Sequence, residues 1–251
     1  MTKDQVFGTN HNSVGVKPSE VTVESGSKFI GAVFFYMALA LLVTFAVTGG
    51  MGALFRFAIY DGSEQSAQAF LMFFIGALIL YIPVMIWVHI AARRNGKSVP
   101  VAFFVYSILM GVIISPICVV FDFWTILIAL GTTVLAFAVM ALIAWTTKKN
   151  LSGFAVVGFG LLIGALVLSL FNFILYLIVG FEPLYWLVSF LFFVAIIILT
   201  IVDLNNVKRI AMSGGASKNI AFMCALNLYV DFIYIFIRIL RFVAIILGNK
   251  R

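Results

Sequence analysis

The fold is decided by residues 225–241, which read ALNLYVDFIYIFIRILR. Polar side chains interrupt this apolar run at steps of four, three, four and three residues, at Asn227, Asp231, Tyr234, Arg238 and Arg241. On an α-helix this spacing places them in one stripe along a single face. A charged side chain at the centre of a membrane helix costs about 2.5–3.5 kcal/mol on insertion scales. We therefore predict that the stripe faces protein or a wet cavity, and that this helix lies in the middle of a helical bundle.

The composition of the chain is that of a membrane protein. Hydrophobic residues make up 64% of the sequence and charged residues only 10%, whereas a soluble domain carries about 25% charged residues. Apolar stretches of about 20 residues recur along the chain, which is the length that crosses roughly 30 Å of hydrocarbon. These features exclude a soluble globular domain and predict an all-α polytopic membrane protein.

Seven apolar stretches form the predicted membrane domain, residues 29–251, which follows a polar tail at residues 1–28. The tail has no apolar core near Met1, so a cleavable signal peptide is not expected. Within the third stretch we expect a kink at Ser115 and Pro116, because proline removes a backbone donor. The predicted spans cover about residues 29–55, 67–92, 99–120, 124–147, 154–179, 184–207 and 220–248.

Positive charge in the connecting loops predicts the orientation in the membrane. The loops after the second, fourth and sixth spans hold Arg93, Arg94, Lys97, Lys148, Lys149, Lys208, Arg209 and Lys218. The loops after the first, third and fifth spans hold only Arg56. Because cytoplasmic loops carry the excess of Lys and Arg, the amino terminus and the even-numbered loops are predicted to be cytoplasmic. The net charge of +7 therefore reflects membrane topology, and nucleic acid is not an expected partner.

The last apolar segment leaves two topologies open. Seven full crossings place Lys250 and Arg251 outside the cytoplasm, against the distribution of charge in the loops. Either the six preceding spans override these two terminal charges, or the last segment is re-entrant. We expect seven crossings.

Two acids lie inside the late apolar segments. Asp203 is near the end of the sixth span, and Asp231 is about a dozen residues into the last segment. Antiparallel neighbours joined by a short loop could bring both carboxylates to a similar depth. Two carboxylates a few Å apart in a low dielectric cannot both ionise cheaply, so they share a proton. This pair is a candidate pH-responsive element, since intramembrane acids are functional by default. The alternative is that Asp203 caps a helix end and Asp231 pairs with Arg238 or Arg241.

Other polar or reactive side chains give weaker indications of a function. Arg93 and Arg94 end the second span and are typical of topology markers that snorkel to the interface, although either could reach the first of the two acids. His89 is expected to be an interfacial residue and not a ligand. Cys118 and Cys224 lie within apolar stretches, so neither a disulfide framework nor a metal site is indicated.

Residues 225–233 (ALNLYVDFI) and 240–242 (LRF) closely resemble the closing signature of the Bax inhibitor family of transmembrane proteins. The resemblance continues upstream and covers about Arg93 to Arg241. The further matches occur in the family's order, at Ser115-Pro116-Ile117, Gly131-Thr132, residues 148–152 (KKNLS), Phe171-Asn172 and Asp203-Leu204-Asn205.

This resemblance implies seven transmembrane helices, with the last helix central and wrapped by the other six. It also implies a pH-sensitive calcium leak channel that needs no cofactor. By position, Asp203 and Asp231 become the proton-sharing pair and the candidate calcium site, and Arg93 becomes the latch that holds the closed state. Protonation of the pair weakens such a latch, whereas deprotonation creates a cation site. The expected location is a bacterial cytoplasmic membrane.

The chain also departs from the family pattern. Val202 stands where the family usually has Tyr before the acid, and Tyr234 and Arg238 replace polar Asn positions. Arg238 adds positive charge one turn before Arg241, along the presumed ion pathway. We therefore regard Asn227, Arg238 and Arg241 as candidate pore-lining or counter-charge residues.

A non-conducting membrane regulator is the main alternative function. Bacterial relatives are linked to restraint of a membrane-anchored protease, and eukaryotic relatives to suppression of cell death, so expected partners include the lipid bilayer, cations, protons and other membrane proteins. Enzyme functions fit poorly, because intramembrane aspartyl proteases carry Tyr-Asp and Gly-x-Gly-Asp, whereas these acids follow Val202 and Val230. A retinal protein needs a Lys within the last helix, and a rhomboid-type protease needs an intramembrane Ser/His pair.

Overall fold

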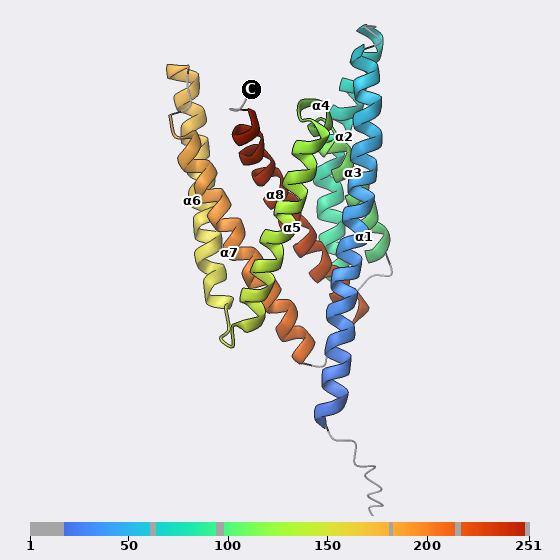
Figure 1. Ribbon diagram of the computed structural model, residues 1–251, viewed down its shortest axis with the longest axis vertical. Helices are drawn as coiled ribbons and strands as arrows, with labels where there is room; N and C mark the ends of the chain where they lie inside the picture. Colours follow the sequence, from blue (N-terminus) through green and yellow to red (C-terminus); the bar gives the residue numbers. More distant parts are fainter. Residues whose placement is uncertain (1–17, 61–63, 94–97, 181–182, 214–216, 249–251) are drawn as a thin grey trace, which may run out of the picture.

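The computed structural model describes residues 18–60, 64–93, 98–180, 183–213 and 217–248, and within these ranges the chain is helical with no strand (Figure 1). Six of the described segments are long and apolar enough to cross a membrane. The helices are α1 (Pro18–Tyr60), α2 (Glu64–Arg93), α3 (Val99–Ile114), α4 (Ile117–Val120), α5 (Phe123–Thr146), α6 (Ser152–Val179), α7 (Tyr185–Met212) and α8 (Lys218–Gly248).

Two helices extend beyond the predicted spans. α1 begins at Pro18, so the last part of the predicted polar tail is helical, and proline suits the first position of a helix because its fixed φ matches the helical value. α7 continues to Met212 and carries Lys208 past the end of α5. The Lys208 ammonium donates to the carbonyl oxygens of Trp145 at 2.7 Å and Thr147 at 3.0 Å. These bonds satisfy carbonyls at the end of α5 that have no helical partner.

α8 lies at the centre of the bundle, as the polar stripe predicted. It packs against α1, α2, α3, α5 and α7, and its residues Leu228, Tyr229 and Ile233 are fully enclosed. α6 instead packs mainly on α7, at one edge of the molecule (Figure 1). The expectation that all six other spans wrap the last helix is therefore wrong for α6. The reason is the short turn after Val179, which folds α6 back against α7.

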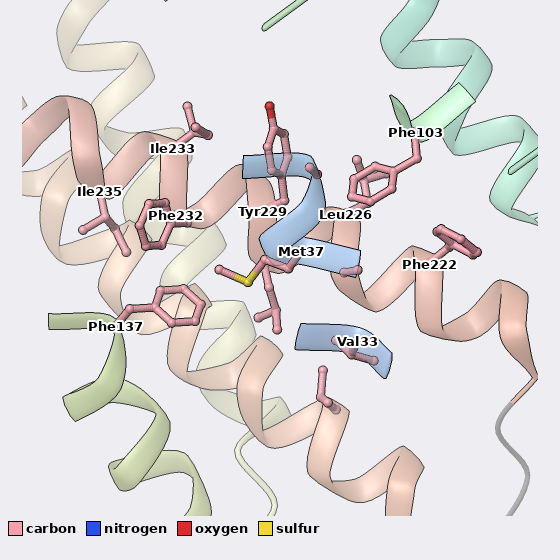
Figure 2. Packing of buried hydrophobic residues seen from close by; sticks show 14 of the residues in the cluster. Val33, Met37, Phe103, Phe137, Phe222, Leu226, Tyr229, Phe232, Ile233 and Ile235 are labelled. Carbon is pink, nitrogen blue, oxygen red and sulfur yellow. The ribbon is translucent and has the colours of Figure 1, made fainter. Parts of the chain in front are cut away.

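Side chains from neighbouring helices fill the centre around α8. Figure 2 shows Val33 and Met37 of α1, Phe103 of α3 and Phe137 of α5 converging on the apolar face of α8. The Phe103 ring meets the Tyr229 ring edge-on at a centroid distance of 5.8 Å. Because lipid chains are as apolar as these side chains, close packing and not removal from water holds such helices together.

The predicted kink in the third span is confirmed, because α3 ends at Ile114 and α4 begins after Pro116. The Ser115 N–H bonds to the Val112 carbonyl at 3.2 Å instead of continuing the α-helical pattern. The Gly111 carbonyl accepts a hydrogen bond from the Thr48 hydroxyl of α1 at 3.0 Å. Backbone groups released by a helix break inside a membrane need partners of this kind. The break is therefore tied to α1.

We expect Gly111→Ala to destabilise the contact between α1 and α3. A Cβ atom on Gly111 would lie 2.7 Å from the Thr44 carbonyl oxygen and 2.7 Å from the Val47 Cβ atom. Overpacking of this kind costs about 1–3 kcal/mol, so the melting temperature of the purified protein in detergent should fall by several degrees. Gly131→Ala is the matched control, because a Cβ atom there meets nothing within 4 Å. Equal melting temperatures for the two variants would contradict the close approach.

Candidate functional site

The two predicted acids lie on neighbouring antiparallel helices, Asp203 on α7 and Asp231 on α8. Their carboxylates are close enough to interact electrostatically. Thr200, one turn before Asp203, is fully buried and lies within hydrogen-bonding reach of the Asp231 carboxylate. The structure thus brings together the two acids that the sequence singled out, with a hydroxyl group between α7 and α8 at the same level.

Asp231 is the more enclosed member of the pair. The residue as a whole is half-buried, but its Oδ2 atom is fully buried and has no hydrogen-bond partner among the described residues. Asp203 has Asn206 within hydrogen-bonding reach. A buried ionised carboxylate that lacks a donor is costly. The Oδ2 atom of Asp231 is therefore a buried acceptor whose partner is not supplied by the described residues.

A pocket of about 450 Å³ opens beside the acid pair. It lies between the second half of α7 and the first half of α8, at the end of the bundle that holds the Lys- and Arg-rich loops, which we call the basic end. Its polar lining includes Asp203, Asn206, Arg209, Ser213 and Asn227. The predicted site residue Asn227 thus shares a pocket with Asp203. The pocket is large and polar enough to hold water, so water at the basic end can reach Asp203.

The two arginines of the stripe lie in the other half of α8, away from the acids. Arg238 donates to the Ser189 hydroxyl at 3.1 Å, and its guanidinium lies 5.5 Å from the centre of the Phe192 ring. Arg241 donates to the Tyr185 hydroxyl at 3.3 Å. Neither arginine pairs with Asp231 among the described contacts, so the alternative of an Asp231–Arg structural pair is wrong. The reason is distance along the helix, since Arg238 is about 10 Å beyond Asp231 at 1.5 Å per residue.

The predicted latch residue Arg93 is the last residue of α2, and its side chain lies outside the described residues, as does all of Arg94. The latch stays a prediction. On the preceding turn, the His89 ring nitrogen Nδ1 lies 2.8 Å from the carbonyl oxygen of Met85 in its own helix.

The polar stripe of α8 is only partly enclosed. α2 and α7 each pack against α8 but make no comparable contact with one another. Tyr234 is 43% exposed, and Arg241 is also exposed. The prediction that the stripe faces protein or a wet cavity therefore holds at Asp231 and in part at Tyr234, whose side chain has Tyr81 of α2 within hydrogen-bonding reach.

The sequence analysis missed a buried hydroxyl cluster on the other side of α8. Tyr229 is fully buried, and its hydroxyl oxygen lies 2.7 Å from Thr44 Oγ1. The Thr44 hydroxyl also lies 3.0 Å from the Ser107 carbonyl oxygen. The only sequence signal was a tyrosine within an apolar span, which usually needs a hydroxyl partner when buried. The spacing of residues along α8 could not show that the partner lies on α1.

The remaining predicted residues are structural. Asn172 is buried, and its side-chain oxygen accepts the Leu184 N–H at 3.0 Å, which closes the turn between α6 and α7. Cys118 and Cys224 are free thiols. Within the described ranges, no group of three or more His, Cys, Asp or Glu side chains could hold a metal ion. Any cation at Asp203 and Asp231 would therefore complete its shell with amide oxygens and water, since Ca²⁺ takes about 6–8 oxygen ligands.

An apolar helical bundle with a carboxylate pair beside its central helix defines a polytopic membrane protein with an intramembrane acid site. Comparison with known families makes the assignment specific, because the family described as "Inhibitor of apoptosis-promoting Bax1" matches residues 26–250. The chain belongs to this Bax inhibitor-like family, and the resemblance seen in residues 225–241 is confirmed.

Two of the similar proteins are named as membrane proteins. The chain is 28% identical over 233 residues to the inner membrane protein YbhL of Escherichia coli K12, a match that covers 89% of this chain and 92% of YbhL. It is 31% identical over 172 residues to an uncharacterized membrane protein of Streptococcus pyogenes serotype M1, covering 68% of this chain and 73% of the relative. An uncharacterized protein of Borreliella burgdorferi is 26% identical over 236 residues, 90% of this chain and 93% of that protein.

Proposed function

We propose that the protein is a pH-sensitive calcium leak channel in which a proton shared by Asp203 and Asp231 controls ion flux. The observation that carries this proposal is the juxtaposition of two carboxylates on α7 and α8, one of them with a buried oxygen that lacks a partner. In a low dielectric, two adjacent carboxylates cannot both be charged cheaply. The pair can therefore hold a proton or a cation, and the local pH decides between them.

On this proposal, the conformation described here is the closed state of the channel. The polar pocket reaches Asp203 and Asn227 from the basic end. Further along α8, Ile233 and Phe236 are buried against the surrounding helices. Phe236 also lies edge-on to the Phe45 ring of α1 at a centroid distance of 5.4 Å. Opening requires α8 or its neighbours to move so that water can pass this apolar level.

We further propose that α8 is a seventh membrane crossing and that the basic end is cytoplasmic. α8 has 31 residues, which span about 46 Å at 1.5 Å per residue and exceed the hydrocarbon thickness of roughly 30 Å. Figure 1 shows α8 running from the end where α1 begins to the opposite end of the bundle. The excess of Lys and Arg in the loops supports a cytoplasmic basic end, and we propose a bacterial cytoplasmic membrane as the location of the protein.

Calcium influx into proteoliposomes tests the function directly. The purified chain should admit calcium faster than empty vesicles. If protonation of the acid pair releases an Arg latch, the influx should rise as the pH falls from about 8 to about 6. Influx that does not depend on pH would contradict proton control. No influx at either pH, from protein shown to be folded by its melting transition, would contradict the channel.

A non-conducting regulator of other membrane proteins is the second candidate function. It is favoured by Arg238 and Arg241, which place two positive charges on the stripe that also carries Asp231. Positive charges along a pathway oppose the passage of cations. In this case the family fold would bind and restrain a membrane partner such as a membrane-anchored protease. Absence of flux in both the wild type and Arg238→Gln would favour the regulator, whereas flux that appears only in Arg238→Gln would show a conduction path blocked by this charge.

A further inference from the structure

A second charged cluster lies on α7 and α8, at the end of the bundle opposite the basic end. Arg238 and Arg241 are one turn apart on α8, and they donate to Ser189 and Tyr185, which are one turn apart on α7. Arg238 is half-buried, although it lies about ten residues before the end of α8. The proposed ion site does not use this cluster.

The cluster has an excess of hydrogen-bond donors. Each guanidinium carries five N–H donors and no acceptor. Among the described contacts, one donor of Arg238 and one of Arg241 are used, both on neutral hydroxyl groups. No acidic side chain of the described residues forms an ion pair with either guanidinium. Two positive charges at this depth therefore favour an anion.

The geometry favours an anion that offers several oxygen atoms. Two guanidinium groups one helical turn apart lie within reach of one tetrahedral anion, since (i, i+3) side chains are neighbours on a helix. Arginine binds phosphate through two parallel hydrogen bonds, which an ammonium group cannot reproduce. The hydroxyl groups of Tyr185 and Ser189 lie beside the guanidinium groups and can also donate to phosphate oxygens.

The surroundings of the cluster are suited to a lipid. Trp186 is 61% exposed and Phe190 is 61% exposed on α7, and Ile245 is 52% exposed on α8. Tyr185 and Trp186 form an edge-on ring pair at 5.8 Å at the first residues of α7. Tyr and Trp gather at the membrane interface, where phospholipid headgroups lie. Acyl chains could therefore cover the exposed apolar side chains while the phosphate meets the arginines.

We propose that Arg238 and Arg241, supported by Tyr185 and Ser189, bind the phosphate group of an anionic phospholipid in the leaflet at this end of the bundle. The lipid supplies the counter-charge that the described part of the protein does not provide to these arginines. The site is distinct from the acid pair at Asp203 and Asp231.

Native mass spectrometry of the delipidated, full-length protein with added phosphatidylglycerol tests this site. The wild type should retain phosphatidylglycerol at least about tenfold more tightly than Arg238→Gln/Arg241→Gln, because charge-assisted bonds to phosphate are lost. Arg56→Gln is the matched control. This arginine also lies at the end opposite the basic end, but its Nε donates to the Cys118 carbonyl at 3.0 Å, and its loss should leave lipid retention unchanged.

Three further results test the site and the identity of its ligand. Each single variant should weaken retention, which keeps the test valid if the double variant does not fold. Inorganic phosphate in large excess should not displace the lipid, whereas displacement would assign the site to a soluble phosphate and overturn the lipid. Equal retention by the wild type and the folded arginine variants would overturn the site itself.

Discussion

Asp231→Asn should flatten the pH dependence of calcium influx. In the wild type, loss of the shared proton makes the acid pair more negative. This change in charge alters both the cation site and the attraction between the pair and any arginine that binds it. With asparagine in place of Asp231, one carboxylate remains, and it has no acid neighbour with which to share a proton. We expect the influx at about pH 6 and at about pH 8 to differ several-fold in the wild type and to become nearly equal in the variant.

Proteoliposomes loaded with a pH-sensitive dye and a calcium-sensitive dye report the pH and the calcium influx in one preparation. Asp122→Asn is the matched control, because it also removes one carboxylate but lies at the first turn of α5. The Asp122 side chain accepts the Thr125 N–H at 3.1 Å as a helix cap, and asparagine caps a helix about as well as aspartate. Asp122→Asn should therefore keep the wild-type pH profile. An unchanged profile in Asp231→Asn would remove the acid pair from the gating mechanism.

The same substitution also separates the two candidate functions. A channel loses its pH response but still conducts. A regulator conducts in neither form, and its Asp231→Asn variant should be more stable, because the buried Oδ2 atom that lacks a partner is replaced by an amide. A higher melting temperature with no flux in either protein would therefore favour the regulator.

The central position of α8 could be predicted from the sequence because the residues that indicate it lie close together in the chain. The steps between Asn227, Asp231 and Tyr234 define one helical face, and an intramembrane charge must be sheltered. The kink at Ser115 and Pro116 is likewise a local property of proline. Such signals depend on residues a few positions apart, and they need no knowledge of which helices are neighbours.

The order of helices around α8 could not be predicted in the same way. α6 is apolar on nearly every face, so no periodic pattern tells which side of it meets a helix and which meets lipid. Its position against α7 and away from α8 is a property of the three-dimensional packing. For the same reason, the contact between Thr44 and Tyr229 became visible only in three dimensions.

The position of the acid pair could be predicted from the sequence only in part. The short loop between α7 and α8 makes them antiparallel neighbours, so similar depth for Asp203 and Asp231 could be inferred from the sequence. The rotation of each helix about its axis could not be inferred from the sequence. The structure adds that Thr200 lies at the same level and that the pocket reaches Asp203 but is not lined by Asp231.

Arg93→Ala should increase calcium influx at neutral pH. α2 ends at Arg93 at the basic end and packs against α8, which α7 also contacts. A guanidinium at the end of α2 that holds the Asp203 carboxylate would tie α2 to α7 and keep the channel closed. Loss of one charge-assisted hydrogen bond, about 1.5–3 kcal/mol, should raise the open population about tenfold or more if the closed state dominates.

Arg94→Ala is the matched control for the latch, because it removes the same charge from the next residue in the sequence. If only Arg94→Ala raises the influx, Arg94 is the latch, and if neither variant does, no arginine of α2 holds the channel closed. The decisive comparison combines Arg93→Ala with Asp203→Asn. Two partners in one interaction give non-additive effects, so Arg93→Ala should add little influx once Asp203 has lost its charge. Full additivity would show that Arg93 acts on flux without contacting Asp203, through the general attraction between a basic membrane edge and its lipid surface.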